Sequence, residues 1–132
     1  MALETENKQL DPDTIHRGVA ALFESPELGF YLVAEQDGKV VACLMITTEW
    51  SDWRNGIFWW IQSVYVVAEA RRQGLFSLLY EHVAAKAKSD PKVCGFRLYV
   101  EKENHVAQSV YLSLGMSETD YKLFETEISR GS

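Results

Sequence analysis

The stretch from residue 57 to residue 100 limits the fold most, because it reads as a strand, a helix and a second strand in succession. Residues 57–67, IFWWIQSVYVV, are rich in the aromatic and β-branched residues that favour strands. Residues 74–88, GLFSLLYEHVAAKAK, carry apolar side chains at helical spacing, and residues 96–100, FRLYV, are strand-like again. Such a connection joins two parallel strands of one sheet, nearly always with right-handed geometry. The passage therefore predicts an α/β fold.

Flanking segments extend this unit into a mixed sheet with helices. Asp37 and Gly38, a dipeptide that favours tight turns, separate two strand-like runs and predict a hairpin. Asp11 is a suitable N-cap, with Pro12 at the first position of the helix that follows. The expected elements are a helix within 10–25, strands 30–36 and 39–50, a turn at 51–56, strand 57–67, helix 74–88, strand 96–100, helix 104–115 and a last strand at 122–128. No repeat or linker interrupts them, so residues 1–132 are expected to form a single domain.

The composition excludes several classes of protein. A net charge of −6 argues against a general nucleic-acid binder, which needs many cations to neutralise phosphates. Cys43 and Cys94 form no CxxC pair and are too few for a disulfide framework, so we expect reduced thiols in the cytoplasm. The longest apolar run, residues 40–46, is too short to span a membrane, and no secretory signal pattern opens the chain. No metal is expected, because the histidines lack ligand spacing: His16, His82 and His105.

A small basic segment lies between the strand and the helix of the crossover. Amides at a helix N-terminus have no partner within the helix and lie at the positive end of its dipole, so such a junction binds anions. Gly74 lacks a Cβ and lets a ligand approach the backbone, while Arg71 and Arg72 add forked donors for phosphate oxygens. Taken alone, a solvated basic turn explains the segment better, since short matches of this kind recur by chance.

The last predicted helix carries a second group of residues. Asn104, Ala107 and Tyr111 follow one another at i, i+3 and i+7, so they share one stripe of the helix. An N-cap role for Asn104 and core packing for Tyr111 explain these two residues as well. The neighbouring stripe is expected to face the core: Val106, Val110 and Leu114.

Together, the two groups resemble the GNAT superfamily of acetyl-CoA-dependent N-acetyltransferases over roughly residues 28–127. The family's acetyl-CoA loop has the form (Arg/Gln)-x-x-Gly-x-(Gly/Ala), matched here by Arg71, Gly74 and, imperfectly, Phe76. Its later pattern, Asn-x-x-Ala-x-x-x-Tyr-x-x-x-Gly, is met at Asn104, Ala107, Tyr111 and Gly115. The resemblance implies a central, mostly antiparallel sheet that splays at a parallel strand pair and is flanked by helices. The family's first strand has no counterpart here, because only MALETENKQ precedes the first predicted helix.

The resemblance also implies an activity, the transfer of an acetyl group from acetyl-CoA to a primary amine of a small molecule, with a polyamine-like layout. In such enzymes the loop amides hold the pyrophosphate of coenzyme A, and the backbone of the preceding strand pairs with the pantetheine arm. Tyr111 would protonate the departing thiolate. The implied cofactor-binding residues are Val64, Val66, Arg71, Arg72, Gln73, Gly74, Leu75, Phe76, Ser77 and Asn104.

Two positions differ from the family pattern. Gln62 stands where relatives often carry a carboxylate, and an amide cannot accept a proton at neutral pH. Glu49 is our first candidate for the base, ahead of Asp52, Glu101 and His105. Phe76 stands at a position usually occupied by Gly or Ala, so it either packs into the core or presses on the ligand. Glu49 and Asp52 also lie near four tryptophans that either hold a cation by their π-faces or simply pack: Trp50, Trp53, Trp59 and Trp60.

Two other functions compete with acetyl transfer. Gln62 and the short N-terminus are consistent with a non-catalytic acyl-CoA-binding or sensor domain of the same fold. A nucleotide or phosphate-ligand binder is the second alternative, although the chain has neither a Walker lysine nor a GxGxxG motif. A homodimer would cover the exposed sheet edge that a missing first strand leaves.

Overall fold

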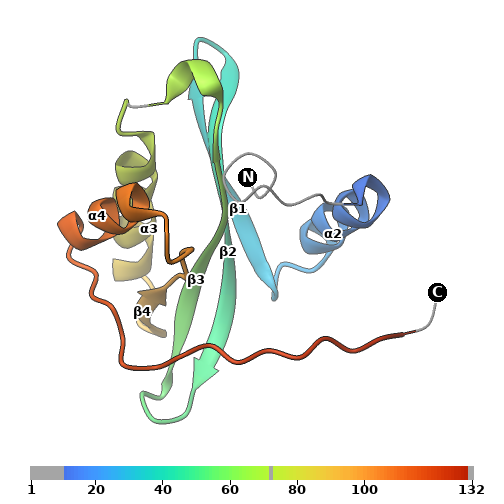
Figure 1. The fold of residues 1–132 in the computed structure, drawn as a ribbon, viewed down its shortest axis with the longest axis vertical. Coiled ribbons are helices and arrows are strands. Elements are labelled where there is room, and N and C mark those ends of the chain that lie inside the picture. Colours follow the sequence, from blue (N-terminus) through green and yellow to red (C-terminus); the bar gives the residue numbers. More distant parts are fainter. Residues whose placement is uncertain (1–10, 72, 131–132) are drawn as a thin grey trace.

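The computed structural model of the chain describes residues 11–71 and 73–130 and contains one sheet with helices on both faces. Figure 1 shows α3 and α4 on one side of the sheet and α2 on the other. The elements are α2 (Pro12–Glu24), β1 (Gly29–Gln36), β2 (Lys39–Ser51), β3 (Gly56–Val66), the short 3₁₀ helix η1 (Ala68–Ala70), α3 (Leu75–Lys88), β4 (Val93–Arg97) and α4 (His105–Ser113). Among the described residues, no helix is both long and apolar enough to cross a membrane.

The strands lie in the order β1-β2-β3-β4. The pairs β1–β2 and β2–β3 are antiparallel, whereas β3 and β4, which are joined through α3, are parallel. The α/β class and the parallel strand pair predicted from residues 57–100 are therefore confirmed. The β3–β4 ladder ends at the pair Trp60↔Arg97, while β3 continues to Val66, so the two strands share only the first half of β3.

A bulge in β3 follows shortly after the end of its ladder with β4. Met45 of β2 is opposite Gln62 of β3, and Cys43 is opposite Tyr65. The step from Met45 to Cys43 covers two residues of β2, whereas the step from Gln62 to Tyr65 covers three residues of β3, so β3 holds one extra residue. Ser63 lies within this bulge with φ 51°, a left-handed conformation that is uncommon for residues other than Gly. Bulges bend a strand and increase its twist, and they are frequent beside active sites.

The core lies between α3 and the sheet. Leu44, Ile46 and Val83 are the largest side chains that are fully buried. Alternate residues of β2 and β3 point toward α3, as the two-residue period of a strand requires. The buried cluster consists of Ala42, Leu44, Ile46, Trp59, Ile61, Leu79 and Val83.

The ends of two helices match their sequence signals. Asp11 caps α2, where its Oδ2 accepts a hydrogen bond from the Thr14 N–H at 3.3 Å. Gly115, with φ 94°, ends α4, and the Met116 N–H returns to the Tyr111 carbonyl at 3.1 Å. This six-to-one bond is typical of helices that end at a left-handed glycine.

Three local predictions are wrong. The last strand of the sheet is Val93–Arg97 rather than 96–100, because only residues 93–97 run beside the first half of β3. The expected core stripe of α4 does not form at Val106, whose side chain is 80% exposed, although Val110 and Leu114 are half-buried. Residues 122–128 form no strand in the single chain.

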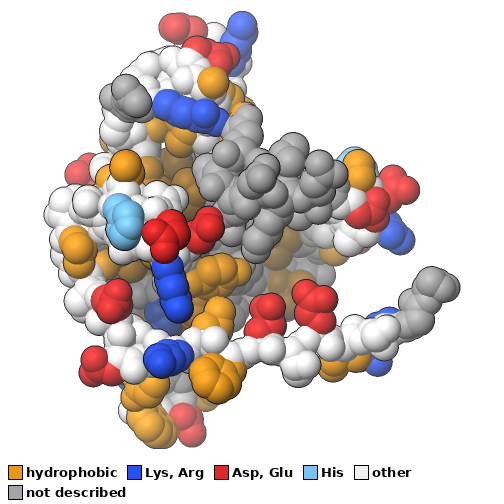
Figure 2. Space-filling model, in the orientation of Figure 1, with side chains coloured by type: hydrophobic (Ala, Val, Ile, Leu, Met, Phe, Trp, Pro, Cys, Tyr) orange, Lys and Arg blue, Asp and Glu red, His pale blue; other side chains and the backbone are white. Residues whose placement is uncertain are grey.

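The segment after α4 leaves the body of the molecule. Residues 117–130, which we call the C-terminal arm, contain no helix or strand. In Figure 1 the arm crosses the lower part of the sheet in this view and then runs out toward the C-terminus, and Figure 2 shows its far part standing clear of the body. Every large apolar side chain of the arm is at least 71% exposed, namely Tyr121, Leu123, Phe124 and Ile128. A strand needs a neighbouring strand for its backbone hydrogen bonds, and among the described residues the arm lies paired with none.

Candidate active site

The predicted phosphate loop ends at an open helix N-terminus. Gly74 is the N-cap of α3, with φ 70° and ψ 23°, and α3 has no side-chain cap. The Leu78 N–H donates to the Gly74 carbonyl at 3.1 Å and closes the first turn. A Cβ added at Gly74 would meet nothing within 4 Å, so the space beside this helix end is open. The first amides of α3 therefore have both the direction and the room to bind an anion.

Hydrogen bonds hold the loop before α3 against the ends of β3 and β1. The Arg71 Nε donates to the Val66 carbonyl at 3.0 Å, at the end of β3. Gln73 accepts a hydrogen bond from Gln36 of β1 at 3.3 Å. Arg71 thus positions the loop as well as adding charge, and its contact with phosphate stays a prediction. Arg72 lies outside the described residues.

Phe76 packs inward, which decides between the two interpretations of its side chain. It contacts the core cluster and meets the ring of Tyr111 edge to face, with 5.4 Å between the ring centroids. Leu75 also packs against the core, and Ser77 is half-buried. The first turn of α3 therefore presents its backbone to the open space while its apolar side chains support Tyr111.

Tyr111 is half-buried on α4, on the same side of the sheet as α3. Burial raises the pKa of its phenol above the ordinary value of 10, because the charged phenolate would lose hydration. Tyr111 is therefore protonated at neutral pH. Asn104 caps α4, and its Oδ1 accepts from the Ala107 N–H at 3.1 Å. Contact with a ligand would then fall to its amide N–H groups.

Glu49 takes part in a different arrangement, on the opposite face of the sheet. Its Oε1 accepts hydrogen bonds from the Trp60 Nε1 at 2.8 Å and from the Arg97 Nη1 at 2.9 Å. The Arg97 guanidinium lies 3.7 Å from the centre of the Phe58 ring. Ile46 points toward α3, so Glu49, three residues further along β2, points away from it. The structure does not bring Glu49 and Tyr111 together on one face, and the role of Glu49 as the base stays a prediction.

Further residues of this face were missed in the sequence. Gln62 donates a hydrogen bond to the Thr47 Oγ1, beside the Glu49–Arg97 pair. Thr47, Glu49 and Ser51 occupy alternate positions of β2, on the face opposite the buried Ile46, and this period of two could have identified the polar face. Arg97 could not be found in this way, because it is 48 residues from Glu49.

The tryptophans do not gather into a cage. Trp59 packs in the core, Trp60 donates to Glu49, and Trp53 is 85% exposed. The other base candidates are exposed, namely Asp52, Glu101 and His105. Within residues 11–71 and 73–130, no group of three or more His, Cys, Asp or Glu side chains could hold a metal ion.

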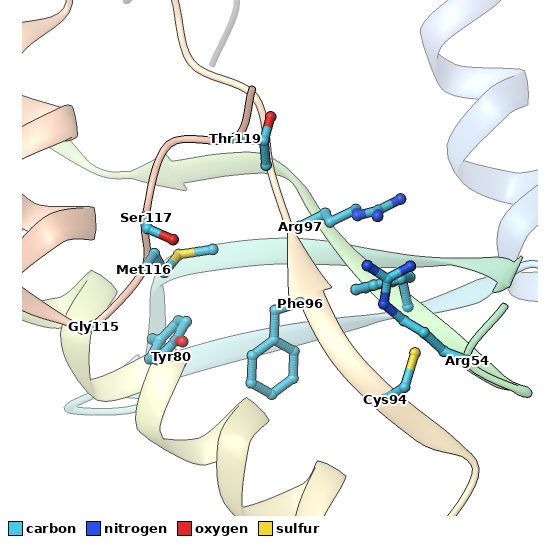
Figure 3. Close-up of a pocket in the computed structure, with 10 residues that line it drawn as sticks. Arg54, Tyr80, Cys94, Phe96, Arg97, Gly115, Met116, Ser117 and Thr119 are labelled. Carbon is cyan, nitrogen blue, oxygen red and sulfur yellow. The ribbon is translucent and has the colours of Figure 1, made fainter. Parts of the chain in front are cut away.

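A pocket of about 380 Å³ lies at the outer edge of β4, which we call the edge pocket (Figure 3). Cys94, Phe96 and Arg97 of β4 line one side, and Met116 and Ser117 line the other. None of the described residues predicted to bind the cofactor or to act in catalysis lines it. The edge pocket is therefore separate from the open helix end at Gly74.

Comparisons with known proteins agree with this geometry. Residues 2–116 match the family model "Acetyltransferase (GNAT) family". The chain is 49% identical to a possible acetyltransferase from Clostridium difficile 630, with 98% of this chain and 85% of that chain covered and a TM-score of 0.90. No curated protein gives a significant match.

Two more distant structures share the fold. The aminoglycoside 6'-N-acetyltransferase AAC(6')-IG from Acinetobacter haemolyticus is 20% identical, with 96% of this chain and 90% of that chain covered and a TM-score of 0.71. AAC(6')-Iy, in complex with the bisubstrate analogue CoA-S-monomethyl-acetylneamine, is 15% identical, with 90% and 82% covered and a TM-score of 0.75. The family match over most of the chain and the 49% identical neighbour show that this protein belongs to the GNAT family of acetyltransferases.

Proposed function

We propose that the protein transfers the acetyl group of acetyl-CoA to the primary amine of a small molecule. The observation that carries this proposal is the contact between Phe76, in the first turn of α3, and Tyr111 of α4. In this contact, the first turn of α3, with its open N-terminus, touches the Tyr111 phenol, whose pKa is raised by burial. The N-terminus of α3 and the Tyr111 phenol both lie near the part of β3 that extends past its ladder with β4.

The described residues fit the cosubstrate. The open N-terminus of α3 would hold the pyrophosphate, with Arg71 beside it. The backbone of β3 around Val64 and Val66, beyond the last pair with β4, would hold the pantetheine arm together with Asn104. When bound, acetyl-CoA supplies the thioester that an amine attacks. Tyr111 would then give its proton to the sulfur that leaves.

The acidic chain suits a cationic acceptor. One protein of the same fold is an aminoglycoside 6'-N-acetyltransferase, and another, AAC(6')-Iy, is bound to the bisubstrate analogue CoA-S-monomethyl-acetylneamine. Aminoglycosides carry several amines. An alkylammonium must lose a proton before it attacks, and Glu49 is our candidate to remove it, acting through its second oxygen, Oε2. The non-catalytic alternative gains support here, because Oε1 of Glu49 already accepts two hydrogen bonds.

The test is release of free coenzyme A thiol from acetyl-CoA in the presence of a panel of polyamines, aminoglycosides and aminoacyl compounds. We expect amine-dependent release with at least one class. Tyr111→Phe keeps the ring contact with Phe76 and should lower kcat by about 10²-fold or more, with little change in the KM for acetyl-CoA.

Tyr80→Phe is the matched control. Tyr80 is also partly buried and also contacts Phe76, with 6.3 Å between ring centroids, so its replacement should leave turnover unchanged. Coenzyme A binding by calorimetry without release from any amine would favour the non-catalytic domain instead.

A further inference from the structure

Charged and aromatic side chains from three strands meet on the face of the sheet that is turned away from α3. Glu49 of β2 is the cross-strand partner of Phe58, and Phe58 is opposite Gly95 of β4. Two residues along β3, Trp60 is opposite Arg97. Partners in a sheet place their side chains on the same face, so these residues form one surface. With Arg54, from the turn between β2 and β3, this surface makes up what we call the arginine cluster: Glu49, Arg54, Phe58, Trp60 and Arg97.

One oxygen of the Glu49 carboxylate is fixed, and the other is left for a ligand. Oε1 accepts hydrogen bonds from Trp60 and from Arg97, whereas none of the described residues donates to Oε2. Arg97 is itself held in place, because its guanidinium lies 3.7 Å from the centre of the buried Phe58 ring. Phe58 has little room to move, since a Cβ at Gly95 would lie 2.9 Å from its ring. The Glu49 side chain is 43% exposed, so an ammonium group from solvent can reach Oε2.

Arg54 adds a second guanidinium beside the first. Its Cζ lies 4.9 Å from the centre of the same Phe58 ring, and Figure 3 shows the Arg54 and Arg97 side chains reaching to the same side of β4. No carboxylate within the described residues is paired with Arg54, whose hydrogen bond to the Ser51 Oγ is long, at 3.5 Å. The arginine cluster therefore holds two guanidinium groups and one carboxylate, an excess of one positive charge in a chain of net charge −6.

The edge pocket continues this cationic surface. Arg54, Phe58 and Arg97 belong to its wall, Ser117 and Thr119 contribute hydroxyl groups, and none of the described residues that line it is acidic. Forked guanidinium donors are well suited to carboxylate and phosphate oxygens. An anion between the two arginines would also relieve their mutual repulsion. A second ammonium group in the same place would meet two positive charges instead.

We propose that the acceptor is a small zwitterion, whose primary amine binds at Oε2 of Glu49 and whose carboxylate or phosphate group binds between Arg54 and Arg97. This inference rests on the proposed function and names its substrate class. Cross-strand partners have Cβ atoms about 5 Å apart, so Glu49 and the guanidinium groups on Phe58 lie within the reach of a short ω-amino acid. The β3–β4 ladder ends at Trp60 and Arg97, so the amine would lie where the two strands separate.

Acceptors that differ in one terminal group test this class. The panel contains glycine, β-alanine and γ-aminobutyrate, the amide of each, and the diamines of the same length. Phosphoethanolamine and ethanolamine form a further pair, which compares phosphate with carboxylate as the anion. In the thiol release assay, kcat/KM should be about tenfold or more higher for the best anionic acceptor than for its uncharged counterpart, and lower again for the diamine. Equal rates for all three, or the highest rate with the diamine, would overturn the proposal.

Variants of Arg54 assign the preference to this residue. Arg54→Gln should lower kcat/KM for the anionic acceptor about tenfold and leave the amide unchanged, because only the anionic group loses its partner. Arg54→Lys keeps the charge and should retain most of the preference. Lys88→Gln is the matched control, since Lys88 is exposed on α3, on the other side of the sheet, and its replacement changes the net charge equally. An equal loss with acid and amide in Arg54→Gln would mean that Arg54 acts through the fold alone, and would overturn the assignment.

A binding measurement separates this inference from acetyl transfer itself. Coenzyme A without an acetyl group cannot react, so calorimetry of the acceptors with protein saturated with coenzyme A reports recognition alone. Tighter binding of the anionic acceptors than of their amides, weakened by Arg54→Gln, would support the zwitterion site even if no amine releases thiol, a result that would refute acetyl transfer only. Thiol release from many amines, with no difference between acids and amides, would leave acetyl transfer standing and overturn the site.

Discussion

Gly74 and Gly38 adopt nearly the same left-handed backbone conformation in two different surroundings. Their φ angles are 70° and 78°, and a Cβ at either position would meet nothing within 4 Å. Replacement of either glycine by Ala should therefore lower the free energy of unfolding by about 1–2 kcal/mol, because a residue with a side chain is less stable in the left-handed conformation. Gly38 lies in the β1–β2 turn, whereas Gly74 begins α3.

This pair separates backbone strain from ligand approach. Gly74→Ala should also weaken coenzyme A binding about tenfold or more, since a methyl group would stand over the helix end that receives the pyrophosphate. Gly38→Ala should bind as the wild type does. Urea unfolding and calorimetry measure the two effects, and equal binding by both variants would argue against this helix end as the phosphate site.

Tyr111 makes a prediction about alkaline pH. Because its pKa is raised by burial, the folded chain holds this proton more tightly than the unfolded chain, whose tyrosines titrate near 10. Its contribution to stability is therefore fully present below pH 10 and is lost as the pH rises through the raised value. The alkaline limb of kcat that this phenol causes should likewise lie above pH 10. Tyrosinate absorbance of the wild type minus that of Tyr111→Phe isolates this group, and a difference titration centred below pH 10 would contradict the assignment.

At the level of elements, Gly29 and Gly18 test how closely the strands are packed. A Cβ at Gly29, where φ is 155°, would lie 1.9 Å from the Ile46 carbonyl oxygen, whereas one at Gly18 of α2 would meet nothing within 4 Å. Gly29→Ala should destabilise the fold by about 3 kcal/mol, because β1 must move away from β2. Gly18→Ala should stabilise it by about 1 kcal/mol through helix propensity. Chemical denaturation of both variants checks this, and a mild effect at Gly29 would show that the β1–β2 contact can relax.

The elements also show which predictions a sequence can support. Local signals sufficed for α2, where Asp11 and Pro12 mark the start, and for the hairpin at Gly38. β4 was placed three residues too late, because its extent depends on how far β3 runs beside it, and the bulge at Ser63 leaves no trace in periodicity. The alternation in residues 122–128 indicates a strand, but the structure has none there, because alternation does not report whether a neighbouring strand is present.

The candidate site was predictable to a similar extent. Gly74, Asn104 and Tyr111 were predicted from two motifs whose order and spacing resemble the GNAT family. The left-handed N-cap and the raised pKa of the phenol are consistent with their predicted roles. The contact between Phe76 and Tyr111 joins two helices that are distant in sequence, and the Glu49–Arg97 pair joins two strands. Such contacts follow from the packing of the whole sheet, which periodicity does not describe.

For the molecule as a whole, one sheet holds two separate openings. The end of β3 and the start of α3 would face the proposed cosubstrate, and the edge pocket lies at the outer edge of β4. Both openings result from the short β4, which pairs with β3 only as far as Trp60 and Arg97. In the proposed complex, acetyl-CoA would therefore extend the sheet beyond the end of the β3–β4 ladder.

The length of β3 beyond that ladder has a consequence for the fate of the protein in a cell. A ligand that lies along residues 61–66 would protect from local opening the part of β3 that pairs with β2 alone. Since anything that binds the folded state stabilises it in proportion to the logarithm of its concentration, chains without acetyl-CoA would be digested first. The amount of enzyme that survives proteolysis would then follow the supply of acetyl groups, so a starved cell would hold less of it without any change in synthesis.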